Sequence, residues 1–116
     1  MTEINRTYYV TGELESECFE INGMREGEYK EYYQDGNIRQ ICPYVNNKKH
    51  GLEKNYRENN VLHYTTEYID NILDGYEKFY NPSGKIFYVR IYYKGELDGE
   101  VKHATQLEML NNEGII

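Results

Sequence analysis

The sequence lacks long apolar runs and a surplus of positive charge. Only 39% of its 116 residues are apolar, and the mean hydropathy is −0.89. No stretch is long enough to span a bilayer and no charged-then-apolar leader opens the chain, so we expect a soluble, cytoplasmic protein.

The formal net charge is −7. Nucleic-acid binding needs cations that displace counterions from phosphate, so this charge argues against a nucleic-acid partner. It favours a basic protein partner, or serves only to keep the protein soluble.

Cysteine is scarce as well, because Cys18 and Cys42 are the only two. They stand 24 residues apart (42 − 18), at the same phase of a repeat described below. If each repeat adds two strands to a sheet, equivalent positions lie about 9–10 Å apart. A disulfide needs Cα atoms within about 7 Å. We therefore predict two reduced thiols that act as packing residues, with a redox pair as the alternative.

Tyrosine, in contrast, is abundant. The chain has 14 tyrosines, which make up most of its 15% aromatic content. A tyrosine can bury its ring while its hydroxyl stays hydrated, so it suits a half-wet surface. Disordered chains are poor in aromatic residues, so this composition predicts an ordered protein in spite of its polarity.

A strict period of 24 residues runs through the chain. It links Gly27, Gly51, Gly75 and Gly99 (51 − 27, 75 − 51 and 99 − 75 are each 24), and it also links the lysines three residues after each glycine. A fixed period of this length indicates one supersecondary unit copied along a line. We predict a single domain over 1–116, with repeats at about 5–26, 27–50, 51–74 and 75–98 and a partial copy at 99–102.

Each repeat contains two turn signals separated by short segments rich in Tyr, Ile, Val and Phe. The segment from Asn81 to Gly84 predicts a type I turn with Pro82 at its second position and a glycine bulge, which keeps Tyr80 and Ile86 on one face. Residue pairs such as Lys94-Gly95 supply the second turn. We predict an all-β fold, an elongated single-layer antiparallel meander of stacked β-hairpins with two strands per repeat.

The pattern changes after Lys102. The segment from Thr105 to Glu108 predicts a capping box at the start of a short helix, at about 105–112, that ends near Gly114. Such a helix would cover the last edge of an open sheet. A frayed tail is the alternative.

Strand alternation, counted from each repeat glycine, predicts that the recurring tyrosines and lysines share one face of the sheet. The candidate partner-binding residues on this Tyr-rich face are Tyr32, Tyr44, Tyr56, Tyr64, Tyr68, Tyr80, Tyr88 and Tyr92, together with Lys54 and Lys78. The rings either stabilise the sheet by cross-strand packing or form an exposed protein-binding surface. The lysine stems either lie along the rings or form a row of cations for acidic side chains or lipid headgroups. The net charge argues against lipid contact.

Catalytic and metal-binding patterns are not found. His50, His63 and His103 fall at three different phases of the repeat and lack metal-ligand spacing with the cysteines. No glycine-rich loop precedes a helix, so a phosphate cradle is missing too. We therefore expect no catalytic residue, no metal and no cofactor.

The repeats resemble the MORN (membrane occupation and recognition nexus) family. The resemblance rests on the segments 51–56 (GLEKNY) and 75–80 (GYEKFY), the Gly84-Ile86 corner and the 92–95 turn, and covers about 8–102. It is strongest to the short variant in bacterial antitoxin-like and some viral proteins. Asn47, Asn60 and Asn71 replace turn glycines and Glu20 replaces a tyrosine, changes that should adjust the turns without breaking the architecture.

The resemblance implies a curved, single-layer sheet with an aromatic-lined groove, and roles in scaffolding, dimerisation, phospholipid contact or partnership with toxins. We expect a non-enzymatic module that binds a partner protein through its Tyr-rich face, such as an antitoxin or immunity protein. The alternatives are a self-associating scaffold or virion component and, less favoured, a peripheral phospholipid-binding scaffold.

Overall fold

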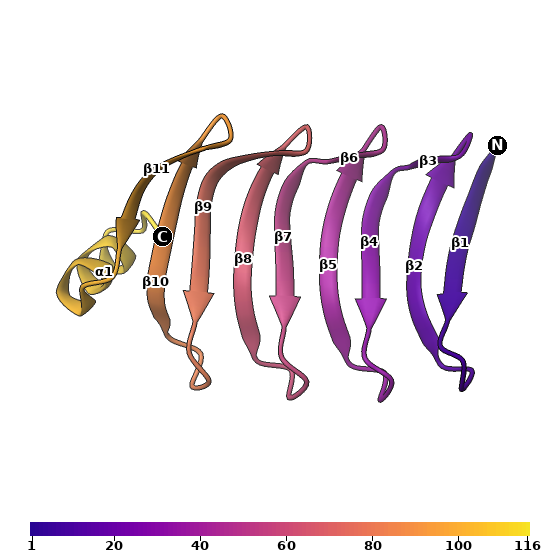
Figure 1. Cartoon of the computed structure of the whole chain (residues 1–116), viewed down its shortest axis with the longest axis horizontal. Helices are drawn as coiled ribbons and strands as arrows, with labels where there is room; N and C mark the ends of the chain where they lie inside the picture. The colour runs from indigo at the N-terminus through magenta and orange to yellow at the C-terminus, as the bar shows by residue number, and fades with distance from the viewer.

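The computed structural model describes all residues 1–116 and consists of one open antiparallel sheet and one helix (Figure 1). The strands run β1 (Thr2–Tyr8), β2 (Leu14–Ile21), β3 (Met24–Arg25), β4 (Gly27–Tyr32), β5 (Ile38–Val45), β6 (Lys48–Lys49), β7 (Gly51–Tyr56), β8 (Leu62–Ile69), β9 (Ile72–Tyr80), β10 (Ile86–Tyr93) and β11 (Glu96–Val101). Each strand pairs with its neighbours in chain order, except that short β3 and β6 pair only with β2 and β5. The predicted meander of consecutive hairpins is confirmed.

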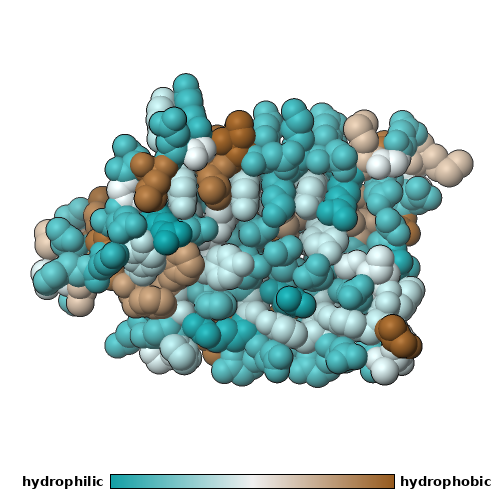
Figure 2. Space-filling view, in the orientation of Figure 1, coloured by the Kyte–Doolittle hydropathy of each residue, from teal (hydrophilic) through white to brown (hydrophobic).

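The sheet is a single layer and buries little. The molecule measures 48 × 31 × 20 Å, and only nine of its residues are buried. Figure 2 shows that most of one face is hydrophilic, with small brown, hydrophobic areas over the upper ends of β8 and β9 and at the margins.

Cys18 and Cys42 are among the buried residues and both are free thiols, as predicted. Burial raises the pKa of the Cys42 thiol to about 12, so this thiol is unreactive at neutral pH.

The turns at the lower end in Figure 1 have the predicted bulged geometry. The Gly84 N–H donates to the Asn81 carbonyl at 2.9 Å, and the Asn81 N–H donates to the Lys85 carbonyl at 2.8 Å. Gly84 has a φ of 88°, and Asn60 takes the equivalent left-handed conformation at 68°. Asparagine tolerates this region better than other residues with a Cβ, which explains how it replaces glycine.

The upper turns join neighbouring repeats as well as neighbouring strands. Both central residues have positive φ, for example 47° at Asp70 and 70° at Asn71, as in a type I′ turn. The Asn71 N–H donates to the Lys49 carbonyl, and the Asn71 side-chain oxygen accepts the Lys49 N–H, both at 2.8 Å. Asparagine in place of glycine therefore adds a hydrogen bond to the preceding repeat.

A β-bulge after each lower turn decides which side chains share a face. Tyr80 lies opposite Ile86, as predicted, but Tyr88 then lies opposite Phe79 because Phe87 is an extra residue in β10. The equivalent extra residues are Arg39 in β5 and His63 in β8. Each extra residue shifts the alternation of the second strand by one position. The prediction that the recurring tyrosines and lysines all share one face is therefore wrong.

The last strand departs from the repeat register by one residue. Between β8 and β9, Thr65 lies opposite Lys78, whereas between β10 and β11 the equivalent Val89 lies opposite Val101. Lys102 consequently points to the other side of the sheet from Lys78, with its Nζ 5.6 Å from the centroid of the Tyr88 ring. The lysine row predicted from the sequence therefore ends at Lys78.

Helix α1 (Ala104–Asn112) forms near the predicted position but begins differently. His103 is the N-cap and has no side-chain capping bond, so the prediction of a capping box at Thr105 is wrong. The end is as expected, because Gly114 has a φ of 74° and Gly114 and Ile115 donate to the Asn111 and Leu110 carbonyls in a Schellman motif. With nine residues, the helix is too short to cross a membrane.

Candidate functional site

The predicted partner-binding residues divide between the two faces of the sheet. We call one side the aromatic face; it carries Tyr44, Tyr64, Tyr68, Tyr88 and Tyr92. We call the other side the lysine face; it carries Tyr32, Tyr56, Tyr80, Lys54 and Lys78. A partner that docks on one face can therefore contact only half of the predicted set.

On the aromatic face, the rings pack against one another. The Tyr64 and Phe79 centroids lie 5.8 Å apart and those of Phe79 and Tyr88 5.3 Å apart, with interplanar angles of 26° and 27°. The Arg90 guanidinium lies 5.3 Å from the Tyr88 centroid and pairs with Glu77 at 3.7 Å. The faces of these rings are therefore already occupied by other groups of the same chain.

The charged groups of the aromatic face are also paired. Glu53 is only 4% exposed, and its carboxylate accepts hydrogen bonds from Lys49 Nζ at 2.8 Å and from Asn55 Nδ2 at 3.1 Å. Burial alone would lower the pKa of Lys49, but its hydrogen bond to Glu53 and the charge of Glu53 raise it to about 12. The Lys49 ammonium also lies 4.9 Å from the Tyr68 centroid. This network stabilises the sheet and offers few free groups to a partner.

On the lysine face, two cations have no acidic partner. Lys54 and Lys78 are half-buried, both lie directly opposite Thr65 on the strand between them, and neither forms an ion pair. Lys30 and Lys102 each pair with a glutamate two residues away in the chain, at 4.0 and 3.4 Å. Thr65 is 3% exposed, so the two ammonium groups flank a closed, polar position.

Exposed apolar side chains lie beside these lysines, toward the upper turns. The strand register places them on this face. Ile69 pairs with Ile72, Ile21 pairs with Met24, and Leu52 lies two residues from Lys54 on the same strand. We call this set the apolar band; its members are Ile4, Phe19, Ile21, Met24, Val45, Leu52, Ile69, Ile72 and Tyr93, all of them exposed. Its members lie on strands from β1 to β10, with none on β4.

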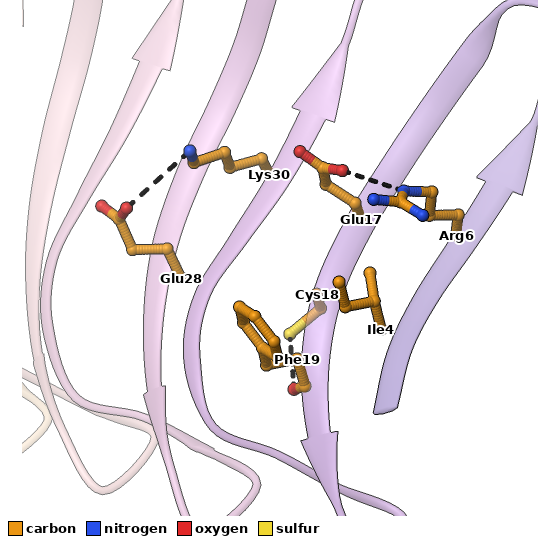
Figure 3. A pocket seen from close by; sticks show the side chains of 7 residues that line it. All are labelled: Ile4, Arg6, Glu17, Cys18, Phe19, Glu28 and Lys30. Carbon is orange, nitrogen blue, oxygen red and sulfur yellow. Dashed lines mark hydrogen bonds and ion pairs between the residues drawn. The ribbon is translucent and has the colours of Figure 1, made fainter. Parts of the chain in front are cut away.

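The apolar band opens into a hollow of about 320 Å³ at the N-terminal end (Figure 3). Ile4 and Phe19 lie opposite each other on β1 and β2 and form its apolar part. The charged part contains two ion pairs, Arg6 with Glu17 at 3.2 Å and Lys30 with Glu28 at 4.0 Å. The Tyr32 hydroxyl donates to Glu17 at 2.8 Å and lowers the pKa of this carboxyl, and the nearby Arg6 acts in the same direction.

One recurring set of contacts was missed in the sequence. The Tyr33 hydroxyl donates to the Tyr56 carbonyl at 2.6 Å, and one repeat later Arg57 donates to the Tyr80 carbonyl at 3.1 Å. Tyr9 makes the same bond to Tyr32. The signal was the same 24-residue step that links the glycines, here joining Tyr9, Tyr33 and Arg57. These side chains tie successive repeats together.

Metal-ligand side chains do not cluster in the structure. No three His, Cys, Asp or Glu side chains come together in a way that could hold a metal ion. His50 Nδ1 lies 3.4 Å from an Asp70 carboxylate oxygen across neighbouring repeats, and the His63 ring packs edge-on against Tyr64.

Comparison with known proteins identifies the repeats. A family model described as "MORN repeat variant" matches residues 25–46, 49–70 and 73–94, three segments of 22 residues, or 66 of 116. No curated protein matches the sequence. Among solved structures, the chain is similar to one titled "Glycosylation Associate Protein (Gap123) complex from Streptococcus agalactiae", with 14% identity and a TM-score of 0.48. The match covers 96% of this chain and 24% of that one.

Proposed function

Because this chain belongs to the MORN repeat variant family, we propose that it is a non-enzymatic interaction module that binds a partner protein through the lysine face of its sheet. The family points to a protein-interaction or scaffold module. The choice of face rests on the side chains that each face leaves unused. Of the residues predicted from the sequence, Tyr32, Tyr56, Tyr80, Lys54 and Lys78 belong to this surface.

The apolar band is the observation that carries the proposal. Large exposed apolar side chains that gather on one face of a protein often mark an interaction site. Its members lie on strands at both ends and in the middle of the sheet, with none on β4, and unpaired lysines lie beside it. On the aromatic face, rings, cations and carboxylates already contact one another, so a partner would gain less there.

The charge of the chain suggests what kind of protein the partner is. A net charge of −7 attracts a basic protein over a distance and speeds its association. We propose an antitoxin or immunity role, in which the chain covers a basic toxin. The proposed pair would associate through the apolar band, with long-range attraction between opposite net charges.

Co-purification from the native host tests both the function and the face. We expect Ile69→Asp to abolish capture of a stoichiometric partner, because it places a charge in the middle of the apolar band. Leu97→Asp is the matched control: Leu97 lies opposite Tyr92 on the aromatic face and is 53% exposed, against 48% for Ile69. Recovery of no protein partner would contradict the function. Loss of capture only in the Leu97 variant would contradict the choice of face.

Self-association as a scaffold is the second candidate, and strand β1 favours it. All seven residues of β1 are exposed, and the strand has a neighbour on one side only. An unpaired strand edge is a template for pairing with another chain. Light scattering at high protein concentration tests this candidate, and a strict monomer would remove it.

A further inference from the structure

We infer that the element that docks on the lysine face is an amphipathic helix of the partner protein, with acidic residues along one edge that meet Lys54 and Lys78. This inference rests on the proposed function and names the chemistry of the partner at the same surface. It follows from what already covers one end of this face, from the spacing of the lysines and from their lack of carboxylates.

The chain's own helix shows that this face accepts a helix. Helix α1 contacts β10, where Val89 is fully buried on the lysine face, and Leu107 of the helix is 5% exposed. Val101, which pairs with Val89, lines a hollow of about 260 Å³ together with Met109 and Leu110. Apolar side chains of a helix therefore pack on this side of the sheet, and the apolar band continues the same side toward β1.

The dimensions of the band suit a helix that lies across the strands. Lys54 and Lys78 stand one repeat apart, on strands separated by β8, so they are about 9–10 Å apart. A helix rises 1.5 Å per residue, so acidic residues at positions i and i+7 are about 10.5 Å apart and reach both lysines. Leu52 lies two residues from Lys54, or about 7 Å along the strand, which is within the width of one helix.

Charge favours an acidic helix of a partner over a second copy of this chain as the element that docks on the lysine face. A second copy packed face to face would place its own Lys54 and Lys78 against this row, and like charges would repel each other. An acidic helix edge instead supplies the carboxylates that these two lysines lack. The net charge of −7 opposes an acidic segment only at longer range, where salt screens it beyond about 8 Å. Close pairs with half-buried lysines are screened less.

A designed peptide tests the inference with the full chain. The probe is a capped helical 22-mer with leucines along one stripe and glutamates every seven residues along its edge. Its matched partner has lysines in place of those glutamates, and a third peptide has the same composition without the stripe. Binding is followed by fluorescence anisotropy at physiological salt. We expect the acidic peptide to bind roughly tenfold tighter than the basic one and the scrambled peptide to bind weakly.

Charge reversal provides the second arm. Lys54→Glu with Lys78→Glu should reverse the preference, so that the basic peptide binds better than the acidic one. Lys85→Glu with Lys102→Glu makes the same charge change at exposed positions off this face and should leave the preference unchanged. Circular dichroism checks that each variant is folded, and Lys54→Gln with Lys78→Gln, which should only abolish the preference, replaces the double reversal if that variant unfolds.

Several outcomes would overturn the inference. Equal binding of the acidic and basic peptides would do so, as would an unchanged preference after the reversal of Lys54 and Lys78. A dimer of the chain that competes with the peptide would assign the band to a second copy, and binding to phosphatidylserine vesicles without peptide binding would assign it to lipid. If the native partner is captured and Ile69→Asp abolishes capture while the lysine reversal does not, the helix inference fails and the proposed function stands.

Discussion

Replacing Gly75 by alanine tests how closely the repeats are fitted together. Gly75 has a φ of 114°, and a Cβ there would lie 2.7 Å from Glu67 Oε2 and 2.8 Å from Glu67 Cδ. The backbone strain of a residue with a Cβ in such a region is about 1–3 kcal/mol. The displaced Glu67 carboxylate would also lose the hydrogen bond that it accepts from the Tyr76 N–H at 2.5 Å, worth roughly 1.5–3 kcal/mol. We expect Gly75→Ala to lower the free energy of unfolding by about 3–5 kcal/mol in total.

Gly36→Ala is the matched control, because Gly36 also has positive φ, at 92°, but a Cβ there would meet nothing within 4 Å. Only the strain remains, so this variant should be about 2 kcal/mol more stable than Gly75→Ala. Urea unfolding followed by circular dichroism measures both, and the slope of the transition shows whether the repeats still unfold together. In a Glu67→Ala background the carboxylate and its hydrogen bond are gone and only a 3.1 Å contact with the Cβ of residue 67 remains, so the difference between the two glycine substitutions should shrink. If Gly75→Ala and Gly36→Ala lower the free energy of unfolding equally in the protein that retains Glu67, the reasoning is refuted.

Two further predictions concern the helix and alkaline pH. Leu107→Ala should destabilise the docking of α1 by about 2–3 kcal/mol, since a buried leucine loses packing at a partly open site, and limited proteolysis should then cleave near the helix first. The pKa of Tyr32 is raised to about 12 by burial and by its hydrogen bond to Glu17. An unfolded tyrosine ionises near pH 10, so Tyr32 contributes fully below that pH and its contribution is lost as the pH rises toward 12. Urea midpoints measured from pH 9 to 11.5 should fall less steeply in Tyr32→Phe; parallel curves would contradict this.

The features that the sequence predicted are the ones encoded over a few residues. Asn81 to Gly84 dictates its turn whatever the rest of the chain does, and the 24-residue step then copies that turn along the sheet. Which side chains of β10 share a face with those of β9 depends on where the strand accommodates one extra residue after Ile86. Phe87 looks like an ordinary alternating residue in the sequence. Only the pairing of its neighbours, Ile86 with Tyr80 and Tyr88 with Phe79, shows that Phe87 is the bulge.

The candidate site was predictable in its members but not in its arrangement. Lys54 and Lys78 stand out by their period, yet the sequence does not show that they lack carboxylates while Lys49 has one. The apolar band was not predicted, because its residues come from different positions of the repeat, such as Phe19 and Leu52. Their common face follows from the bulges, which were not located from the sequence.

The one-residue shift of β11 determines what α1 can cover. In the repeat register, Lys102 would lie opposite Val89, and the apolar side of the helix would meet an ammonium group. The shift gives that place to Val101 and moves Lys102 to the Tyr88 ring on the other side. Strand β11 keeps the repeat sequence, and the register shift alone lets α1 pack beside it. By the same rule, one extra residue within a strand exchanges the two faces for the residues that follow it in that strand, as Phe87 does in β10.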